Sequence, residues 1–273
     1  MTKAVGILAG AGELPVIVAR GIGRQDKKRV VIGLVDNISP TLISESDKFE
    51  RIAVGQLQRC IDHFKKHDVA DVILCGQIDH TKVFHPNSFD PLMLSLIQQD
   101  NRAEAILGRI CAAIEKQGIA VGDLRQFLGK HLINQSLPEL PQLDGKQKAD
   151  VEFGWPIALQ IAELNIGQSI IVNKGVVIAV EAIEGTSNMI QRTAGFNIPG
   201  STVIKIPMSN KDPRFDIPVI GSQTIDSMAA AGASVLVVAK GQTIIIDPEN
   251  CQRLAKEHGI AIIARELPGD RLS

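Results

Sequence analysis

The sequence predicts an α/β protein with an N-terminal Rossmann-like parallel sheet and its helices, followed by a second, mixed α/β domain. Short apolar runs alternate with amphipathic stretches from the first residues onward, which is the rhythm of strand–helix–strand units with parallel strands. The first apolar run ends in a glycine turn, Gly10-Ala11-Gly12. The periodic pattern dissolves in mid-chain and then restarts. We therefore expect a Rossmann-like domain over residues 1–130, a linker over 131–147 and an α/β domain over 148–273.

The N-terminal half alternates buried strands with amphipathic helices. Its apolar runs are short and end at glycine or aspartate, as expected of buried strands. Between them, apolar residues recur at helical spacing, for example Leu57, Cys60, Ile61 and Phe64. The predicted strands are residues 4–9, 29–35, 71–75 and 119–121. The predicted helices are residues 15–24, 56–67, 91–98 and 102–117.

The C-terminal half begins with an amphipathic helix predicted over residues 148–164. Two strands follow, at 169–173 and 176–182, and Lys174-Gly175 between them is typical of a tight hairpin turn. Because a hairpin reverses the chain, the strand directions in this domain must be mixed. The further predicted strands are 202–206, 234–239, 243–246 and 260–264, and the further predicted helices are 187–194, 222–231 and 248–258.

Composition narrows the functional class. Hydrophobic residues make up 45% of the chain, enough for a sizeable core, while a net charge of −1 and 3% aromatic residues argue against binding of nucleic acid. The four cysteines form no C-x-x-C pair, which is typical of buried, reduced thiols. The start lacks the features of a signal peptide, and no apolar run is long enough to span a bilayer. We therefore expect a cytoplasmic protein.

The glycine turn is the first candidate binding element. Gly10 and Gly12 follow a strand and precede a helix, a setting in which backbone amides can bind an anion. A dinucleotide fingerprint would have its third glycine where this chain has Pro15. The turn thus favours a nucleotide or phosphate contact, whereas a nicotinamide oxidoreductase would rest on this turn alone. A tight turn that needs small residues is the simpler alternative.

Two segments of the second half carry further candidates. The loop within residues 205–221 has three prolines, which exclude a regular element, and it concentrates charge at Lys205, Lys211, Asp212, Arg214 and Asp216. A rigid loop with cations and carboxylates suits a phosphate ester and a metal ion, although a solvated charged turn is the simpler alternative.

The second segment comprises Glu181 and Glu184-Gly185-Thr186, which end a buried strand and lead into a helix start, where backbone donors and polar side chains are exposed to a ligand. Alone, these residues could be a surface acid and an ordinary helix cap. Because each domain has such a turn, we expect a ligand cleft between the domains.

Six stretches of the chain together match a known family. They are ILAGAGELP (7–15), CGQI (75–78), LNIGQSIIV (164–172), VVIAVEAIEGTSNMI (176–190), RFDIPVIG (214–221) and GIAIIA (259–264). In order and spacing they resemble the UDP-2,3-diacylglucosamine pyrophosphatases of lipid A biosynthesis, of the two-domain type unrelated to the calcineurin-like phosphoesterases. The resemblance covers nearly the whole chain and is most specific over residues 166–221.

The resemblance implies metal-dependent hydrolysis of the pyrophosphate of UDP-2,3-diacylglucosamine to UMP and 2,3-diacylglucosamine 1-phosphate (lipid X), with Mg²⁺ as the metal. It implies that Asp216, in the R-x-D-x-P motif, is the catalytic aspartate and metal ligand, and that Asp212 assists it. The substrate-binding residues it suggests are Gly10, Gly12, Gln77, Gln168, Glu184, Gly185, Thr186, Lys205 and Arg214. The implied partner is a nucleotide-activated diacyl sugar lipid; peripheral contact with the inner membrane and a homo-oligomer are left open.

The chain departs from the family pattern at three places. Ser187 stands where the family usually has an acid after E-G-T, and Asn101 stands where a second carboxylate is typical. The segment GDLRQ (122–126) stands where a histidine is common. Because magnesium prefers anionic oxygen ligands, these changes leave a second hypothesis open. The chain could be a non-catalytic nucleotide-sugar or lipid-binding protein on the same fold.

Overall fold

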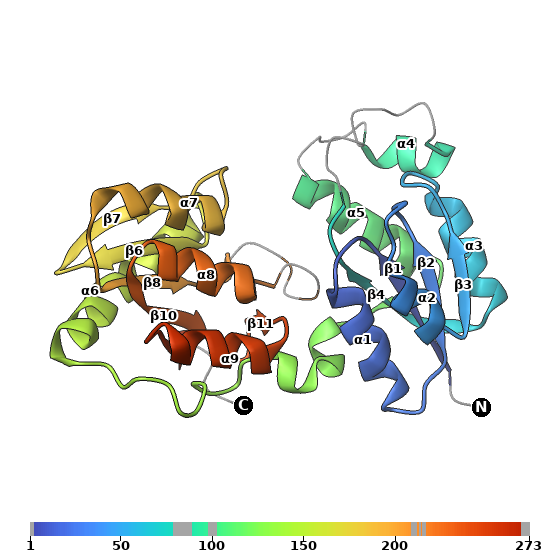
Figure 1. Ribbon diagram of the computed structural model, residues 1–273. Helices are drawn as coiled ribbons and strands as arrows, with labels where there is room; N and C mark the ends of the chain where they lie inside the picture. The colour runs from blue at the N-terminus through green and yellow to red at the C-terminus, as the bar shows by residue number, and fades with distance from the viewer. Residues whose placement is uncertain are drawn as a thin grey trace. The chain divides into compact units, whose positions relative to one another are not determined.

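The computed structural model describes residues 3–78, 89–97, 103–208, 212, 214 and 217–268 (Figure 1). The chain divides into two compact units. Unit 1 is Met1–Gly129 with Asp212–Phe215, and unit 2 is Lys130–Lys211 with Asp216–Ser273. Unit 1 contains a parallel sheet and unit 2 a mixed sheet, each with helices, which confirms the predicted fold class.

The sheet of unit 1 has the order β3-β2-β1-β4-β5, and all of its strands are parallel. Its strands are β1 (Ala4–Ala9), β2 (Arg29–Gly33), β3 (Lys48–Arg51), β4 (Val69–Cys75) and β5 (Ala120–Val121). The sequence did not predict β3. Its residues, KFER, form no apolar run because an edge strand pairs on one side only and leaves side chains exposed.

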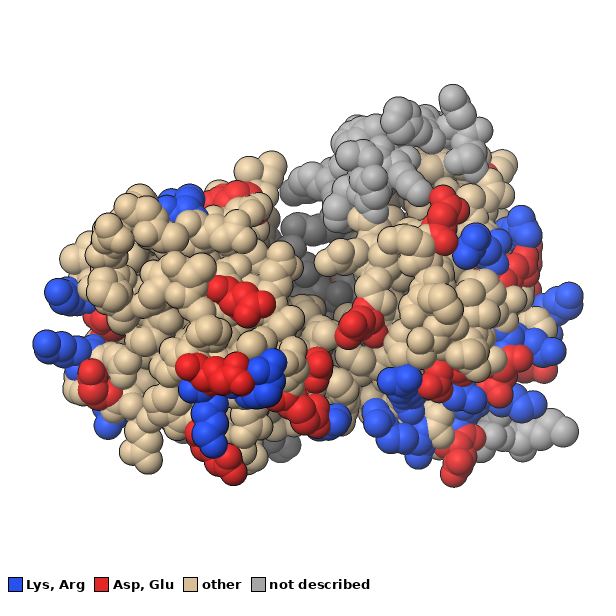
Figure 2. Space-filling model, viewed as in Figure 1, with Lys and Arg blue, Asp and Glu red and all other residues tan. Residues whose placement is uncertain are grey.

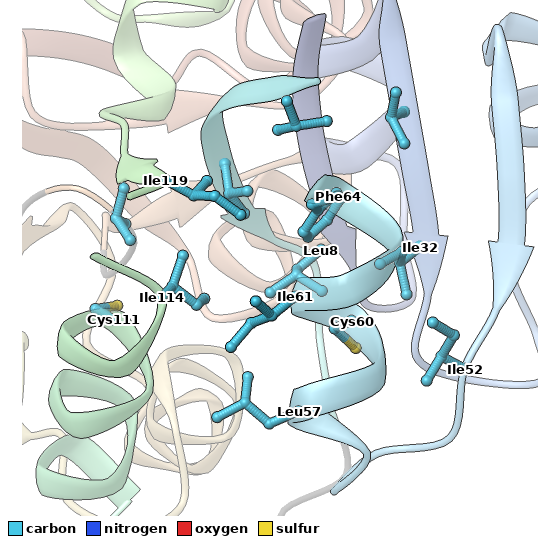
Figure 3. Packing of buried hydrophobic residues seen from close by; sticks show 14 of the residues in the cluster. Leu8, Ile32, Ile52, Leu57, Cys60, Ile61, Phe64, Cys111, Ile114 and Ile119 are labelled. Atoms are coloured by element: carbon cyan, nitrogen blue, oxygen red, sulfur yellow. The ribbon is translucent and has the colours of Figure 1, made fainter. Parts of the chain in front are cut away.

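Helices cover both faces of this sheet. They are α1 (Leu14–Gly23), α2 (Pro40–Glu45), α3 (Leu57–Lys66), α4 (Pro91–Ile97), α5 (Ala103–Lys116) and the 3₁₀ turn η3 (Leu124–Phe127). On one face, Leu8 and Ile32 of the strands pack against Ile61 and Phe64 of α3 and Ile114 of α5 (Figure 3). Helix α1 packs with α2 and η3 and also contacts β1 and β2.

The sheet of unit 2 has the order β12-β10-β8-β6-β7. Strands β8, β10 and β12 are parallel, and β6 runs antiparallel to both β7 and β8, so the predicted hairpin is confirmed. The strands are β6 (Ser169–Asn173), β7 (Val176–Val180), β8 (Ser201–Lys205), β10 (Ala233–Ala239) and β12 (Ala261–Arg265). Two short strands, β9 (Val219–Ile220) and β11 (Ile244–Ile245), pair separately.

Helix α6 (Gly145–Glu163) packs on one face of this sheet through Val151, Trp155 and Ala158. The other face is covered by α7 (Thr186–Thr193), which runs on into the 3₁₀ turn η5 (Ala194–Phe196), and by α8 (Ser222–Ala230) and α9 (Pro248–Glu257).

Helix α6 begins before the predicted residue 148. Asp144 caps it by accepting a hydrogen bond from the Gln147 amide, while the Gln147 side chain accepts one from the Asp144 amide. The C-terminal end of the predicted linker 131–147 is therefore helical. The 3₁₀ turn η4 (Gly129–His131) and the bridge between Leu132 and Ile244 give further order to the segment's start.

The four cysteines, Cys60, Cys75, Cys111 and Cys251, are buried free thiols, as predicted. Burial is the main reason that the pKa of the Cys60 thiol rises to about 12, so this thiol is a packing group at neutral pH. Within the described ranges, no helix has both the length and the apolar character needed to cross a membrane.

Candidate functional site

In unit 1, the glycine turn lies at the point where the strand order reverses, between β1 and β4. In open α/β sheets, ligands bind at the carboxyl ends of the strands beside such a reversal. The Gly10 amide donates to the Cys75 carbonyl (2.9 Å), and Ala11 and Gln77 exchange two backbone hydrogen bonds of 2.7 and 2.9 Å. Two predicted binding residues, Gly10 and Gln77, therefore lie side by side, with the Gly10 amide committed to the sheet.

Backbone packing explains why position 10 must be glycine. A Cβ added there would lie 2.4 Å from the Gln77 carbonyl oxygen, closer than two non-bonded atoms can come. Gly12 has a different requirement, since its φ of 95° is unfavourable for other residues although a Cβ there would meet no atom within 4 Å. Each glycine thus has a local structural reason, independent of any ligand.

In unit 2, the polar residues Ser169, Glu181 and Lys205 lie side by side where the strands β6, β7 and β8 begin or end. Ser169 is the register partner of Lys205, and the Glu181 amide donates to the Ser169 carbonyl. All three side chains are buried. They lie on the face covered by α7, because Ile171, Ala179 and Val203, two residues away in each strand, belong to the core beneath that helix.

Thr186, the first residue of α7, connects these side chains. Its hydroxyl donates to the Glu181 carboxylate (3.0 Å) and accepts from the Lys205 ammonium (3.0 Å). The Ser169 hydroxyl is 3.2 Å away and must be the donor to Thr186, because a threonine hydroxyl has one proton, here given to Glu181. We call Ser169, Glu181, Thr186 and Lys205 the buried polar network.

Lys205 is the cation of this network and is 5% exposed. Burial lowers the pKa of its ammonium group, and the nearby Glu181 carboxylate opposes that shift. A second N–H of the ammonium donates to the Val219 carbonyl (3.1 Å) at the start of β9. Lys205 therefore connects Thr186 to the first residue of β9, the next strand after β8.

The other predicted residues of unit 2 lie around this network. Gly185 precedes α7 with a φ of 80°, which explains the glycine. Glu184 accepts from the Ala182 amide (3.0 Å) and forms an ion pair with Arg192 (3.3 Å); hydrogen bonds from the backbone are the main reason that its pKa is lowered. The carbonyl of Gln168 accepts from the Ile206 amide at 2.8 Å.

Asp212 and Arg214, also predicted site residues, belong to unit 1 and bind each other. The Arg214 guanidinium donates to both oxygens of Asp212 at 2.7–3.0 Å, and also to Glu115 (2.8 Å) and the Val121 carbonyl (3.2 Å). The hydrogen bond from Arg214 is the main reason that the pKa of Asp212 is lowered, and the same bond raises the pKa of Arg214. Both side chains are about one-third exposed. We call Asp212, Arg214 and Glu115 the surface ion cluster.

The predicted catalytic residue and metal ligand, Asp216, lies outside the described residues, as does Asn101. Among the residues that are described, no three His, Cys, Asp or Glu side chains gather in a way that could hold a metal. Asp212 already accepts hydrogen bonds from two N–H groups of the Arg214 side chain, with the Nε–H shared between its two carboxylate oxygens. Asp123 lies in the segment GDLRQ, where the family commonly has a histidine. Its carboxylate forms an ion pair with Arg125. The described residues alone thus do not fit a magnesium ion.

A groove of about 580 Å³ on unit 1 contains none of the predicted residues. Its walls come from the end of α1 and the start of β2, with cations such as Arg24 and Lys28, and from the segment between α2 and β3, with the acids Glu45 and Asp47. Figure 2 shows basic and acidic side chains intermixed over this lower part of unit 1. Arg29 binds both Glu45 and Asp47, so part of this charge is internally paired.

Family models match both parts of the chain. The LpxI N-terminal domain matches residues 4–131 and the LpxI C-terminal domain matches residues 137–263. The chain belongs to the LpxI family. The resemblance found in the sequence is thereby confirmed. A relative from Caulobacter vibrioides named UDP-2,3-diacylglucosamine pyrophosphatase LpxI is 24% identical, with 96% of this chain and 97% of the relative covered.

Solved structures show weaker similarity to this LpxI family member. One called gox2253 has a TM-score of 0.33 at 10% identity, over 97% of this chain and 78% of that one. A biotin carboxylase domain of thermophilic 2-oxoglutarate carboxylase has a TM-score of 0.28 at 15% identity, over 63% of this chain and 35% of that one. At these TM-scores, neither bears on the fold or the site.

The predicted substrate-binding residues left out two members of the buried polar network, Ser169 and Glu181, although Glu181 belongs to the strand-end segment that the sequence singles out. A signal for them exists in the sequence, since each is a polar residue at the end of an apolar strand, as is Lys205. What the sequence does not give is the strand register, which brings these ends together with the start of α7.

Proposed function

We propose that the chain hydrolyses the pyrophosphate of UDP-2,3-diacylglucosamine to UMP and 2,3-diacylglucosamine 1-phosphate. Membership of the LpxI family and the name of the Caulobacter relative, UDP-2,3-diacylglucosamine pyrophosphatase, support this activity. The structural observation that carries it is the buried polar network, which holds the Lys205 ammonium beside the first residue of α7. A fixed cation and a helix N-terminus are both suited to phosphate oxygens.

In this reaction a water oxygen bonds to one phosphorus, the bridging P–O bond breaks, and the bridging oxygen leaves with the other phosphate. The two protons of the water pass to the phosphate products or to the solvent. Phosphoryl transfer depends mainly on positioning and on stabilising negative charge. In the proposed roles, Lys205 and the α7 amides stabilise charge on the phosphate oxygens. Glu181 and Ser169 act as positioning residues, since they fix the Thr186 hydroxyl that binds Lys205.

The further roles in this proposal come from the family resemblance. Asp216 would orient the attacking water and hold Mg²⁺, which would supply charge neutralisation at the pyrophosphate. Asp212 would assist from the same loop, and Arg214 would neutralise phosphate charge, which requires both to exchange their present bonds for the substrate.

The substrate also sets the proposed location. A diacyl sugar lipid is reached at a membrane surface, so the proposal includes a cytoplasmic protein with peripheral contact to the inner membrane. A homo-oligomer stays a prediction from the sequence.

The test is release of UMP from UDP-2,3-diacylglucosamine, with magnesium and again with a chelator. We expect Asp216→Ala to abolish release and Asp226→Ala, the same change at an exposed residue of α8, to retain it. Full activity of Asp216→Ala would refute its catalytic role, and unchanged activity with the chelator would refute the metal. Tight binding of the substrate by the wild-type chain without UMP release would instead support the non-catalytic binding protein.

A further inference from the structure

Three large aliphatic side chains of unit 2 are exposed close to the buried polar network. Ile183 is fully exposed, Leu164 is 68% exposed and Ile166 is 47% exposed. Single exposed aliphatic residues are common on protein surfaces, whereas a group of them beside a candidate ligand site points to an apolar partner. We call Leu164, Ile166 and Ile183 the aliphatic rim.

Backbone packing brings the two segments of the rim to the same edge of the sheet. A Cβ added to Gly167 would lie 2.0 Å from the Glu181 carbonyl oxygen, so the chain after Ile166 touches the chain before Ile183. Glu181 also pairs with Ser169, the register partner of Lys205. The rim therefore flanks the strand ends that carry the buried polar network.

Both segments are held by hydrogen bonds within unit 2. The amides of Leu164 and Ile166 donate to the Gln160 and Ile161 carbonyls, at 2.9 and 3.2 Å, as α6 ends. Next to Ile183, the carboxylate of Glu184 accepts from the Ala182 amide and pairs with Arg192. The acid next to Ile183 is thus paired with a cation of α7, and the rim itself consists of aliphatic side chains.

We propose that the aliphatic rim binds the acyl chains of the diacyl sugar substrate. This inference rests on the proposed function. The rim adjoins the candidate site along the chain. Ile183 is followed directly by Glu184-Gly185-Thr186, and the Thr186 hydroxyl binds the Lys205 ammonium. A substrate whose phosphates lie at Lys205 needs an apolar surface beside them for its acyl chains, and burial of the rim against those chains is favourable.

The test compares a triple variant, Leu164→Ser/Ile166→Ser/Ile183→Ser, with Val176→Ser. Val176 is 58% exposed and is the first residue of β7, at the hairpin end of the strand that runs toward Ile183. Detergent-dispersed UDP-2,3-diacylglucosamine with long acyl chains is compared with an analogue carrying acetyl groups. For the triple variant we expect the KM of the long-chain substrate to rise about tenfold, as when about two buried methylene groups lose contact, with kcat unchanged. The KM of the acetyl analogue, and both constants of Val176→Ser, should not change.

Direct binding of long-chain 2,3-diacylglucosamine 1-phosphate, measured by calorimetry, separates this inference from the proposed function. If the wild type binds this lipid without hydrolysing the substrate, the proposed function fails, and loss of binding in the triple variant alone still supports the rim. Equal binding by wild type and triple variant, or no binding by either, overturns the rim. If the triple variant kept the wild-type KM for the long-chain substrate but bound phospholipid vesicles more weakly, the proposal would also be overturned. The rim would then be a membrane-binding surface.

Discussion

The two units differ in the groups that they carry at the carboxyl ends of their parallel strands. In unit 1, the edge is made of backbone groups, with Gly10 packed against Gln77. In unit 2, the corresponding edge holds charged and hydroxyl side chains that are buried and joined through Thr186. The backbone contacts of unit 1 hold the two strand ends together, whereas the side-chain contacts of unit 2 hold the Lys205 ammonium in place.

The surface ion cluster and the buried polar network also differ in their exposure to solvent. The surface ion cluster of unit 1 is partly solvated, and ion pairs of this kind typically contribute up to about 1 kcal/mol. Lys205 and Glu181 are removed from water, so each depends on the other to offset its desolvation. Loss of a partner should therefore be far more costly in the buried polar network than in the surface ion cluster.

The largest effect is expected for Glu181→Ala. It leaves the buried Lys205 ammonium without its carboxylate, and the free energy of unfolding of unit 2 should fall by about 3–5 kcal/mol. Trp155, the one tryptophan of the sequence, belongs to α6 and is buried against the sheet of unit 2, so its fluorescence reports the unfolding of unit 2 in urea. Glu181→Gln/Lys205→Met removes both charges and should recover much of the stability but none of the UMP release. A cost below about 1 kcal/mol for Glu181→Ala would contradict this contrast.

An intermediate effect is expected for Gly10→Ala in unit 1. The new Cβ would meet the Gln77 carbonyl, so the backbone must shift, at a cost of about 1–3 kcal/mol. Hydrogen exchange of the β1 and β4 amides should show the loss, while Trp155 fluorescence should not. The control is Gly108→Ala in α5, where a Cβ meets no atom within 4 Å and should be neutral or stabilising. Equal exchange in both variants would show that the approach of Gly10 to Gln77 is not tight.

The smallest effect is expected for Asp212→Asn in the surface ion cluster, at about 1 kcal/mol or less at pH 7. Because Arg214 lowers the pKa of folded Asp212, its contribution is complete above the unfolded pKa and disappears as the pH falls through the lowered folded value. The stability difference between wild type and variant, from hydrogen exchange of unit 1, should therefore close at acid pH. It should also shrink with added salt. A difference that persists below both pKa values would show that the carboxylate charge is not its source.

Local patterns predicted most elements of the fold and failed where structure depends on neighbours. The strands of unit 1 with apolar runs were found, whereas β3, with its polar KFER sequence, exists because β2 pairs with it. The early start of α6 had a local signal, the D-x-x-Q capping box at Asp144, which was missed. At the site, Thr186 and Lys205 were predicted as substrate residues, and the structure adds that they contact each other.

Local periodicity and motifs are sufficient to give the α/β class, the order of most strands and helices, and membership of the LpxI family. The tertiary structure decided which polar residues act together. Ser169, Glu181 and Lys205 are far apart in the chain, and strand register alone makes them neighbours on one face of the sheet. Register and burial arise from long-range pairing, so the depressed pKa of Lys205 and the interdependence of its partners exist only in the folded unit.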